Sequence, residues 1–340
     1  MPRRIILLLL LLLLLVSGCG PQQLGVLYDE GLIEVVDIHL HTGEWETTPE
    51  RGKETLVEFF PFPIGLQAEQ AVDGILSRAG LLGELDRAGI RRGVVLAVYA
   101  PKVFGIASNE LVIELLREDA ASGDSRLFGM ASLRFDRWGA GWQAQLSELD
   151  RALDEPNMVG IKLAPPHQHF RMDDPRLNAL AELSASHQAP IYVHTGPSPF
   201  PGTRNEIPYI DPAYIETLLA SHPDTRFVLG HMGYDFLAEN LGFLATCIAL
   251  AQAYPNVYLE PSALGARARE SGRDNMKAVL LAARDGGVLD RVIYGSDGPQ
   301  RPGFLDAYLE DTVAVMEELE FSAAEATAVL SGTFEEIYLN

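Results

Sequence analysis

The stretch Val36-Asp37-Ile38-His39-Leu40-His41-Thr42-Gly43 closes an apolar run that begins at Leu32 and is typical of a β-strand. Side chains alternate between the two faces of a strand, so Asp37, His39 and His41 are expected on one face. Two imidazoles on one strand, two residues apart, can bind one metal ion, and imidazole suits zinc and related transition metals. The polar edge of a half-exposed strand would explain a single histidine, but two histidines and an aspartate opposite apolar residues favour a metal site.

Apolar, β-branched runs alternate with helical patterns along the rest of the chain. Such alternation predicts an α/β fold with parallel strands. Eight strand–helix units in a chain of 340 residues favour a (β/α)8 TIM barrel over a doubly wound open sheet. The expected strands cover residues 33–41, 93–99, 127–134, 159–163, 190–194, 227–230, 257–260 and 292–294. The expected helices cover residues 69–88, 109–118, 141–153, 175–187, 212–221, 236–254, 274–283 and 305–319, and a capping box at Ser322 and Glu325 opens a final one.

Polar side chains stand at the carboxyl ends of several expected strands. His39 and His41 end the first strand, His194 ends the fifth, His231 follows the sixth and Asp297 follows the eighth. Active sites of (β/α)8 barrels lie at this end of the strands. We therefore expect these five side chains to converge at one mouth of the barrel.

Further candidates for substrate contact lie near the same strand ends. Lys162 is near the end of the fourth strand, His167 follows it in a Pro-Pro context, and Arg204 lies in the loop after the fifth strand. For His167 a polar loop residue and for Arg204 a surface salt bridge are at least equal alternatives. The connection from residue 42 to 66 is long, and connections of this length often cover a site, although a packed surface excursion is the alternative.

The ordered set of strand-end motifs resembles the amidohydrolase superfamily of metal-dependent hydrolases. It is most similar to the amidohydrolase-related branch, which also contains mononuclear decarboxylases such as aminocarboxymuconate-semialdehyde decarboxylase. The resemblance runs from about Val35 to the end of the chain. The motifs that carry it are DIHLHTG at 37–43, GIKLAPP at 160–166, IYVHTG at 191–196, LGHMG at 229–233 and IYGSDGP at 293–299.

The resemblance implies a role for each matching residue. The implied metal ligands are His39, His41, His194 and Asp297. His231 matches a histidine that acts on substrate or water in mononuclear members and binds a second metal in binuclear ones. Lys162 is assigned first to substrate contact or the electrostatics of the site, and second to bridging two metals.

A mechanism follows from such a donor set. Three neutral imidazoles and one carboxylate leave a zinc ion with net positive charge and an open position, so that bound water ionises near pH ~7. Asp297 is placed to take the proton, and His231 to stabilise the oxyanion or act as an acid. We expect hydrolysis of an ester, lactone or amide of a small molecule with one divalent metal, zinc being the first choice. Decarboxylation of a small unsaturated acid and noncatalytic binding of a solute or metal by a lipoprotein remain alternatives.

The N-terminus indicates export. Arg3 and Arg4 precede an apolar run from residue 5 to 16, which is shorter than the ~20 residues of a spanning helix and fits a secretory signal. Small residues then precede Cys19, as in bacterial lipoproteins. We expect a signal peptide over 1–18, lipidation of Cys19, a tether over 19–31 and one barrel domain over 32–340. Cys247, in an apolar helical stretch, is expected in the core.

Charge restricts the partners. The formal net charge of −21 argues against nucleic acid, because phosphate binding needs a basic surface. It also argues against attachment to anionic lipids through protein charge, so that membrane contact is expected through the lipid anchor only. No acidic residue follows Cys19 directly, which favours the periplasmic face of the outer membrane in a Gram-negative cell. The sequence leaves homo-oligomerisation open.

Overall fold

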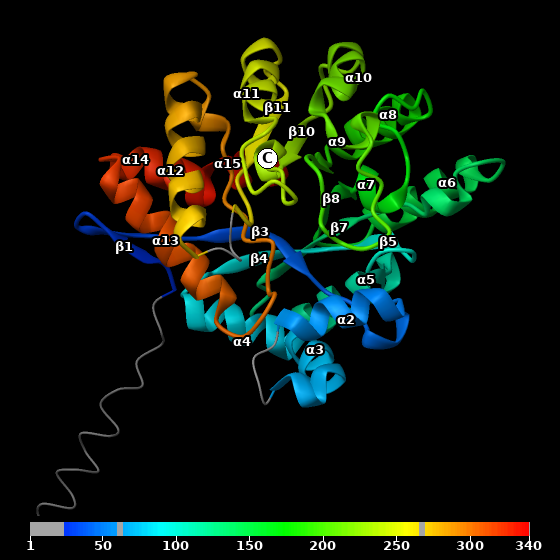
Figure 1. The fold of residues 1–340 in the computed structure, drawn as a ribbon, viewed down its shortest axis with the longest axis horizontal. Helices are drawn as coiled ribbons and strands as arrows, with labels where there is room; N and C mark the ends of the chain where they lie inside the picture. Colours follow the sequence, from blue (N-terminus) through cyan, green and yellow to red (C-terminus); the bar gives the residue numbers. More distant parts are fainter. Residues whose placement is uncertain (1–23, 60–63, 265–268, 340) are drawn as a thin grey trace, which may run out of the picture.

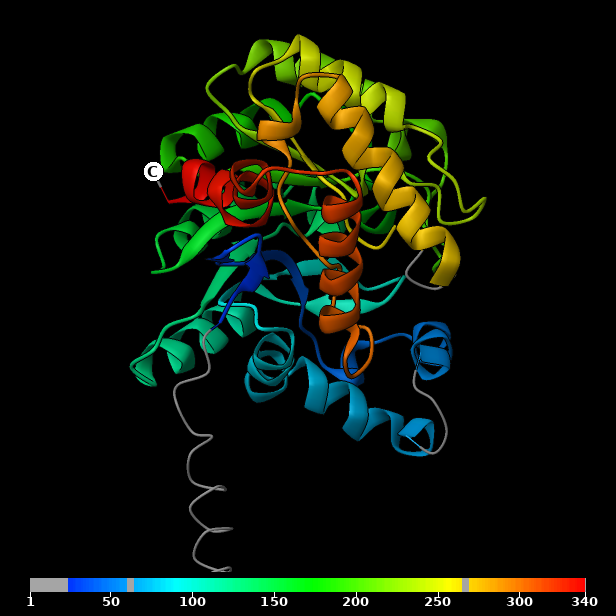
Figure 2. The same ribbon diagram turned by 90° about the vertical axis from the view of Figure 1, so that its left-hand side faces the viewer.

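The computed structural model describes residues 24–59, 64–264 and 269–339. Its centre is a curled sheet of seven parallel strands in the order β11-β10-β9-β8-β7-β4-β3 (Figures 1 and 2). The strands are β3 (Val36–His41), β4 (Arg92–Leu96), β7 (Leu127–Ala131), β8 (Met158–Leu163), β9 (Ile191–His194), β10 (Phe227–Gly230) and β11 (Val257–Glu260). The seven strands agree with seven of the eight runs expected from the sequence, to within a few residues at their ends.

The eighth expected strand is an extended segment that closes the sheet. Val292 forms a parallel bridge with Leu259 of β11, and Gly298 forms a parallel bridge with Leu40 of β3. The segment 292–298 thus joins the first strand to the last, although it is too irregular to pair along its whole length. The expectation of a (β/α)8 barrel is confirmed, and an open doubly wound sheet is excluded.

Helices surround the barrel on its outside (Figure 1). They are α2 (Glu50–Phe59), α3 (Ala68–Leu76), α4 (Arg78–Ala88), α5 (Asn109–Ala121), α6 (Trp142–Leu153), α8 (Leu177–His187), α10 (Glu216–Ser221), α11 (Leu244–Ala253), α12 (Arg269–Asp285) and α13 (Phe304–Glu318). The prediction of a single helix over 69–88 is wrong, because the structure has two helices there. Ser77 has extended backbone, and its side chain accepts a hydrogen bond from Gly80 N. Ser77 therefore caps α4 and separates it from α3.

The C-terminal segment closes the barrel at the amino ends of the strands. Phe334 and Ile337 of α15 (Thr333–Tyr338) pack in one buried cluster with Val36, Val94 and Val228 of the strands. The expected capping box is present, with Ser322 and Glu325 opening α14 (Ala323–Thr327). The amino end of the barrel is thus filled by side chains, and the carboxyl ends of the strands form its open mouth.

Part of the segment predicted as a tether is folded. A hairpin of β1 (Val26–Tyr28) and β2 (Gly31–Ile33) packs on the domain, and the buried Tyr28 hydroxyl donates to Phe321 O at 2.9 Å. This corrects the tether over residues 26–31. The long connection after β3 likewise contains α2. The predicted signal peptide and Cys19 lie outside the described residues.

Smaller elements complete the connections near the mouth. They are a hairpin of β5 (Val98–Ala100) and β6 (Gly105–Ala107), and the short helices α7 (Pro165–Gln168) and α9 (Ile207–Ile210).

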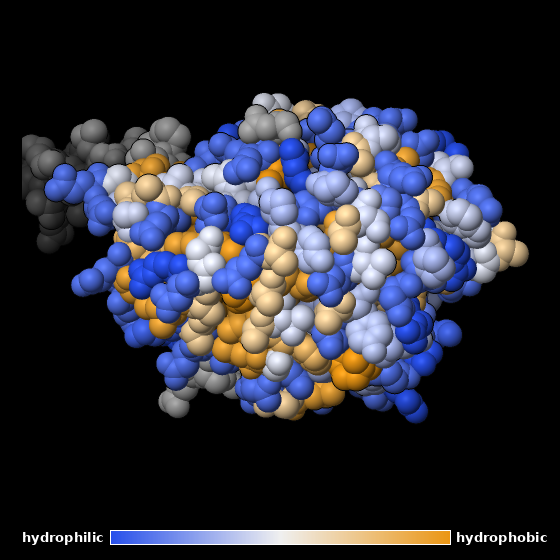
Figure 3. Space-filling view, turned by 90° about the horizontal axis from the view of Figure 1, so that it is seen from above, coloured by the Kyte–Doolittle hydropathy of each residue, from blue (hydrophilic) through white to orange (hydrophobic). Residues whose placement is uncertain are grey.

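Cys247 on α11 is fully buried, as expected. In the described ranges, none of the helices has the length and apolarity needed to cross a bilayer. The face seen from above is largely hydrophilic, with hydrophobic residues exposed between the polar ones (Figure 3).

Candidate active site

The strand-end side chains line one cavity at the carboxyl ends of the strands, with a volume of about 210 Å³. Its lining includes all five expected convergent residues and Lys162, namely His39, His41, Lys162, His194, His231 and Asp297. In-register pairing of β9, β10 and β11 places His194, Gly230 and Glu260 side by side at one level. Convergence of the polar strand ends is therefore observed, while the role of each residue stays a prediction.

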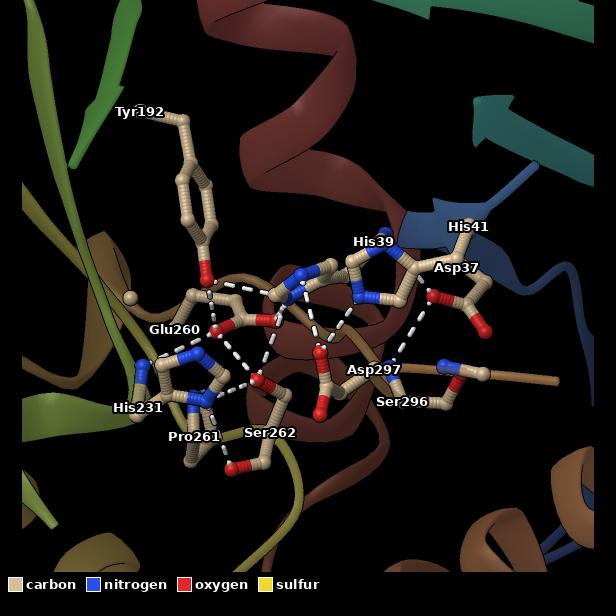
Figure 4. Close-up of polar contacts among 12 residues, drawn as sticks. Asp37, His39, His41, Tyr192, His231, Glu260, Pro261, Ser262, Ser296 and Asp297 are labelled. Carbon is tan, nitrogen blue, oxygen red and sulfur yellow. Dashed lines mark hydrogen bonds and ion pairs between the residues drawn. The ribbon is translucent and has the colours of Figure 1, made fainter. Parts of the chain in front are cut away.

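Asp297 lies between the two histidines of β3 (Figure 4). Its Oδ1 is 2.8 Å from His41 Nε2 and 3.1 Å from His39 Nε2. His39, His231 and Asp297 each offer one ligand atom, and these three atoms lie within 4.8 Å of one another. This group of three is the candidate metal centre.

His194 lies in the cavity wall beside this group but is not part of it. Its Nε2 is 3.2 Å from Gly196 O and donates to that carbonyl, which leaves Nδ1 as the nitrogen with a free lone pair. Its ring centroid is 4.5 Å from that of His231 and 4.7 Å from that of His167. The structure thus places His194 next to the candidate metal centre, oriented by its own loop.

Asp37 does not share the orientation of the two histidines. The pairing of β3 with β4 shifts register between Asp37 and Leu40, which interrupts the regular alternation of side chains. Asp37 Oδ1 accepts from the backbone N–H groups of His39 and Ser296, both at 3.0 Å. Burial raises the pKa of Asp37 to about 7. The expectation that Asp37 faces the site is therefore wrong, and its carboxyl group connects β3 to the closing segment instead.

Sequence reasoning missed Glu260, the last residue of β11. It is fully buried, and its Oε1 is 3.0 Å from His39 Nδ1. Its Oε2 accepts from the Tyr192 hydroxyl at 2.9 Å, from Ser262 Oγ at 2.8 Å and from His231 N at 3.1 Å (Figure 4). A carboxylate that ends an apolar strand was the signal available in the sequence. Three of its partners, His39, Tyr192 and His231, come from β3, from β9 and from the turn after β10, which the sequence does not relate to one another.

Two glycines of the strand-end motifs make room for this network. A Cβ atom at Gly230 would lie 1.9 Å from the Tyr192 hydroxyl, and one at Gly295 would lie 2.0 Å from Glu260 Oε1. Real Cβ atoms do not approach other atoms this closely. The glycines of LGHMG and IYGSDGP therefore allow two buried side chains to cross the interior of the barrel.

Burial sets the protonation states of the site. It lowers the pKa values of His39 and His194 well below the usual range for histidine, and that of His231 to about 4. Burial opposes ionisation of Asp297, but the neighbouring His39 and His41 outweigh it and hold the Asp297 pKa below its usual range. At neutral pH the buried imidazoles are thus neutral and the Asp297 carboxylate is charged.

The hydrogen bonds prepare two of these imidazoles to bind a cation. Glu260 faces His39 Nδ1, so the proton resides there and His39 Nε2 keeps its lone pair beside Asp297. Ser262 Oγ donates to Glu260 and is 2.8 Å from His231 Nδ1, which therefore donates and leaves Nε2 free. Neutral imidazole and carboxylate are donors that transition metals prefer. The residues present therefore fit a divalent metal.

The other predicted contact residues lie at different depths. Lys162 Nζ is 3.1 Å from His39 Nε2 and 3.8 Å from the Tyr192 ring centroid, and burial lowers the Lys162 pKa to about 7. His167 lines the cavity, and its buried Nε2 has no hydrogen-bond partner among the described residues. Arg204 is exposed, pairs with Glu206 at 2.7 Å and does not line the cavity.

Comparison with known proteins places this site in context. A curated relative, Protein fluG of Emericella nidulans, is 32% identical over 111 residues, which are 32% of this chain. The chain matches only 11% of the length of that relative.

Solved structures show the same fold at low identity. An uncharacterised TIM-barrel protein of Bordetella bronchiseptica has a TM-score of 0.63 at 20% identity, covering 90% of this chain and 98% of its own. A probable 2-pyrone-4,6-dicarboxylic acid hydrolase of Acinetobacter baumannii, with citric acid bound, has a TM-score of 0.61 at 15% identity, covering 91% and 100%. A dihydroxybenzoic acid decarboxylase of Polaromonas sp. JS666, with bound manganese, has a TM-score of 0.58 at 17% identity, covering 91% and 97%.

The family model described as "Amidohydrolase" matches residues 36–338, which is nearly the whole described barrel. Its bounds run from the first residue of β3 to the last residue of α15 and enclose all the strand-end motifs. The chain therefore belongs to the amidohydrolase family.

Proposed function

We propose that this protein is a metal-dependent hydrolase that cleaves the ester, lactone or amide bond of a small molecule with water. The observation that carries the proposal is the group of His39, His231 and Asp297, whose ligand atoms lie within 4.8 Å of one another at the floor of the cavity. Burial keeps the two imidazoles neutral, and the neighbouring His39 and His41 keep the Asp297 carboxylate ionised. A divalent cation bound there would supply the positive charge that acidifies water and polarises a carbonyl group.

The residues of the chain carry the proton transfers. From the described part of the chain, Asp297 Oδ2 receives only a 3.2 Å hydrogen bond from Gln300, and so it can take a proton from the attacking water. The water oxygen bonds to the carbonyl carbon, the C–O or C–N bond breaks, and Asp297 returns the proton to the leaving oxygen or nitrogen. Lys162 Nζ lines the same cavity and can donate to the oxyanion that develops on the carbonyl oxygen.

Hydrolysis is favoured over decarboxylation by the charges around the cavity. A decarboxylase substrate must carry a carboxylate, but Glu44 and Glu239 also line the cavity and would repel it. Lys162 is the one cationic side chain among the described lining residues, and it is already within 3.1 Å of His39. An uncharged carbonyl compound meets no such repulsion.

The test combines metal analysis with a substrate panel. Purified protein should contain about one divalent metal per chain and hydrolyse members of an ester and lactone panel. Asp297→Asn should lower kcat/KM by about 10² or more, because general acid–base catalysis contributes 10²–10⁴-fold. Asp150→Asn, a surface aspartate paired with His187, serves as the matched control. Release of CO2 from an acid panel without ester hydrolysis, absence of stoichiometric metal, or full activity of Asp297→Asn would each overturn the proposal.

We also propose that the chain is exported and lipidated at Cys19. The support is the basic pair at residues 3 and 4, the apolar run and the small residues before Cys19. Metabolic labelling with a fatty-acid analogue and cell fractionation test this, with Cys19→Ser as the control that should lose both label and membrane association. Recovery of unlabelled wild-type protein only from the cytosol would refute export.

A further inference from the structure

The cavity has a polar floor and apolar walls. The floor is formed by the strand-end residues described above. One wall comes from α2 and α3, and the second wall comes from the β5–β6 hairpin, which adjoins α2, and from the loops after β9 and β10. The apolar lining residues are Leu56, Val72, Ile75, Leu76, Val98, Phe104, Ile106, Phe200 and Phe236.

Aromatic packing makes the second wall rigid. The rings of Phe104 and Phe200 pack edge to face, with centroids 5.5 Å apart at 67°. Phe104 also packs against His167, with centroids 4.9 Å apart at 76°. Such pairs stabilise a fixed arrangement beyond the burial of their area. A ligand therefore meets a preformed apolar surface rather than one that must be ordered on binding.

The charged groups at the cavity favour an uncharged ligand. Glu44 and Glu239 line it, and both acidic side chains are exposed to solvent. No arginine lines the cavity within the described ranges. A carboxylate on the ligand would have to leave water, enter between apolar walls and pass two carboxylates.

We propose that the site selects an uncharged carbonyl compound whose group next to the carbonyl is aliphatic or aromatic. The carbonyl group lies on the polar floor, and its apolar substituent packs against the apolar lining that α2, α3 and the wall with Phe104 and Phe200 form together. This inference rests on the proposed function for the identity of the carbonyl group. The apolar selection itself rests on the walls and on the charges around them.

Nonreactive ligands test the selection without catalysis. Acetophenone, propiophenone and butyrophenone present a carbonyl with a growing alkyl group and cannot be hydrolysed. Calorimetry on both metal-loaded and metal-free protein should show about fourfold tighter binding for each added methylene, equivalent to about 0.8 kcal/mol. On the metal-free protein, 4-acetylbenzoate, the carboxylate analogue of acetophenone, should bind at least about tenfold more weakly than acetophenone.

Two changes of charge at the cavity test whether the lining charges are the reason that a carboxylate ligand binds weakly. Glu44→Gln combined with Glu239→Gln should tighten 4-acetylbenzoate and leave acetophenone unchanged. Glu182→Gln, an exposed residue outside the lining, is the control. Ile106→Lys places a cation in the wall at a half-buried position and should reverse the preference, whereas Ile207→Lys, 49% exposed and outside the lining, should not.

The outcomes separate this inference from the proposed function. Ketone binding that rises along the series without any ester hydrolysis would support the apolar selection and refute the hydrolase. Ester hydrolysis with a flat ketone series, or with 4-acetylbenzoate bound as tightly as acetophenone, would overturn the apolar selection alone. Thermal unfolding of every variant shows that a change in binding does not come from loss of the fold.

Discussion

Glu260→Gln tests the argument that a buried carboxylate fixes the imidazole of His39. Glu260 Oε1 faces His39 Nδ1, while Oε2 accepts from Tyr192, Ser262 and His231 N. A glutamine that keeps its oxygen at the second position must point its NH2 group at His39 Nδ1. That nitrogen then becomes the acceptor, so the proton moves to Nε2, which loses the lone pair that a metal needs.

The expected loss of metal affinity follows from the hydrogen bonds that the substitution removes. The alternative amide orientation restores the contact to His39 but turns NH2 toward three donors, which leaves them without an acceptor. Either orientation therefore disturbs a histidine of the candidate metal centre. Loss of such an outer partner costs about 10- to 100-fold in metal affinity or activity. We expect a loss of this size, equivalent to about 1.4–2.7 kcal/mol.

The assay is competition with a chromophoric chelator, which reports the metal dissociation constant without any substrate. Unfolding of the metal-free protein is measured in parallel and should change by about 1–3 kcal/mol at most, the cost of an unsatisfied buried group. Glu325→Gln changes the same residue type in the capping box of α14, far from the site, and should lower stability slightly without affecting metal affinity. A folded Glu260→Gln protein that binds metal within twofold of the wild type would refute the reasoning.

Two further predictions concern packing and pH. Gly230→Ala places a Cβ atom 1.9 Å from the Tyr192 hydroxyl and should lower the free energy of unfolding by about 1–3 kcal/mol. Gly74→Ala in α3 should raise it by about 0.5–1 kcal/mol, because beyond its chain neighbours and the backbone of its own helix the new Cβ meets no described atom within 4 Å. Urea unfolding measures both, and equal effects would contradict the packing argument. The pKa of Lys162 falls from 10.5 to about 7 on folding. Between pH 7 and pH 10.5 the unfolded state therefore binds more protons than the folded state. The free energy of unfolding of the metal-free protein should rise with pH in this range, by at most about 1.4 kcal/mol per pH unit. Lys162→Met should flatten this dependence, and an unchanged slope in that variant would show that other groups cause it.

The sequence was sufficient for the features that depend on local pattern. Alternating apolar runs identified the strands, because a buried parallel strand is apolar along its length and is short. The position of polar residues just after those runs predicted that His39, His194, His231 and Asp297 would meet, since all parallel strands end at the same rim. The capping box at Ser322 was equally readable, because its partners are three residues apart.

The tertiary structure decided the features that depend on contacts across the barrel. Glu260 and His39 are 221 residues apart, and nothing in either segment indicates the other. The register shift in β3 arises from pairing with β4, so the regular alternation that placed Asp37 beside the histidines did not hold. Closure by the segment 292–298 depends on bridges to both β3 and β11. Local patterns thus gave the strands and the polar residues at their ends, but only the packed barrel determined which nitrogen of each histidine points at the site.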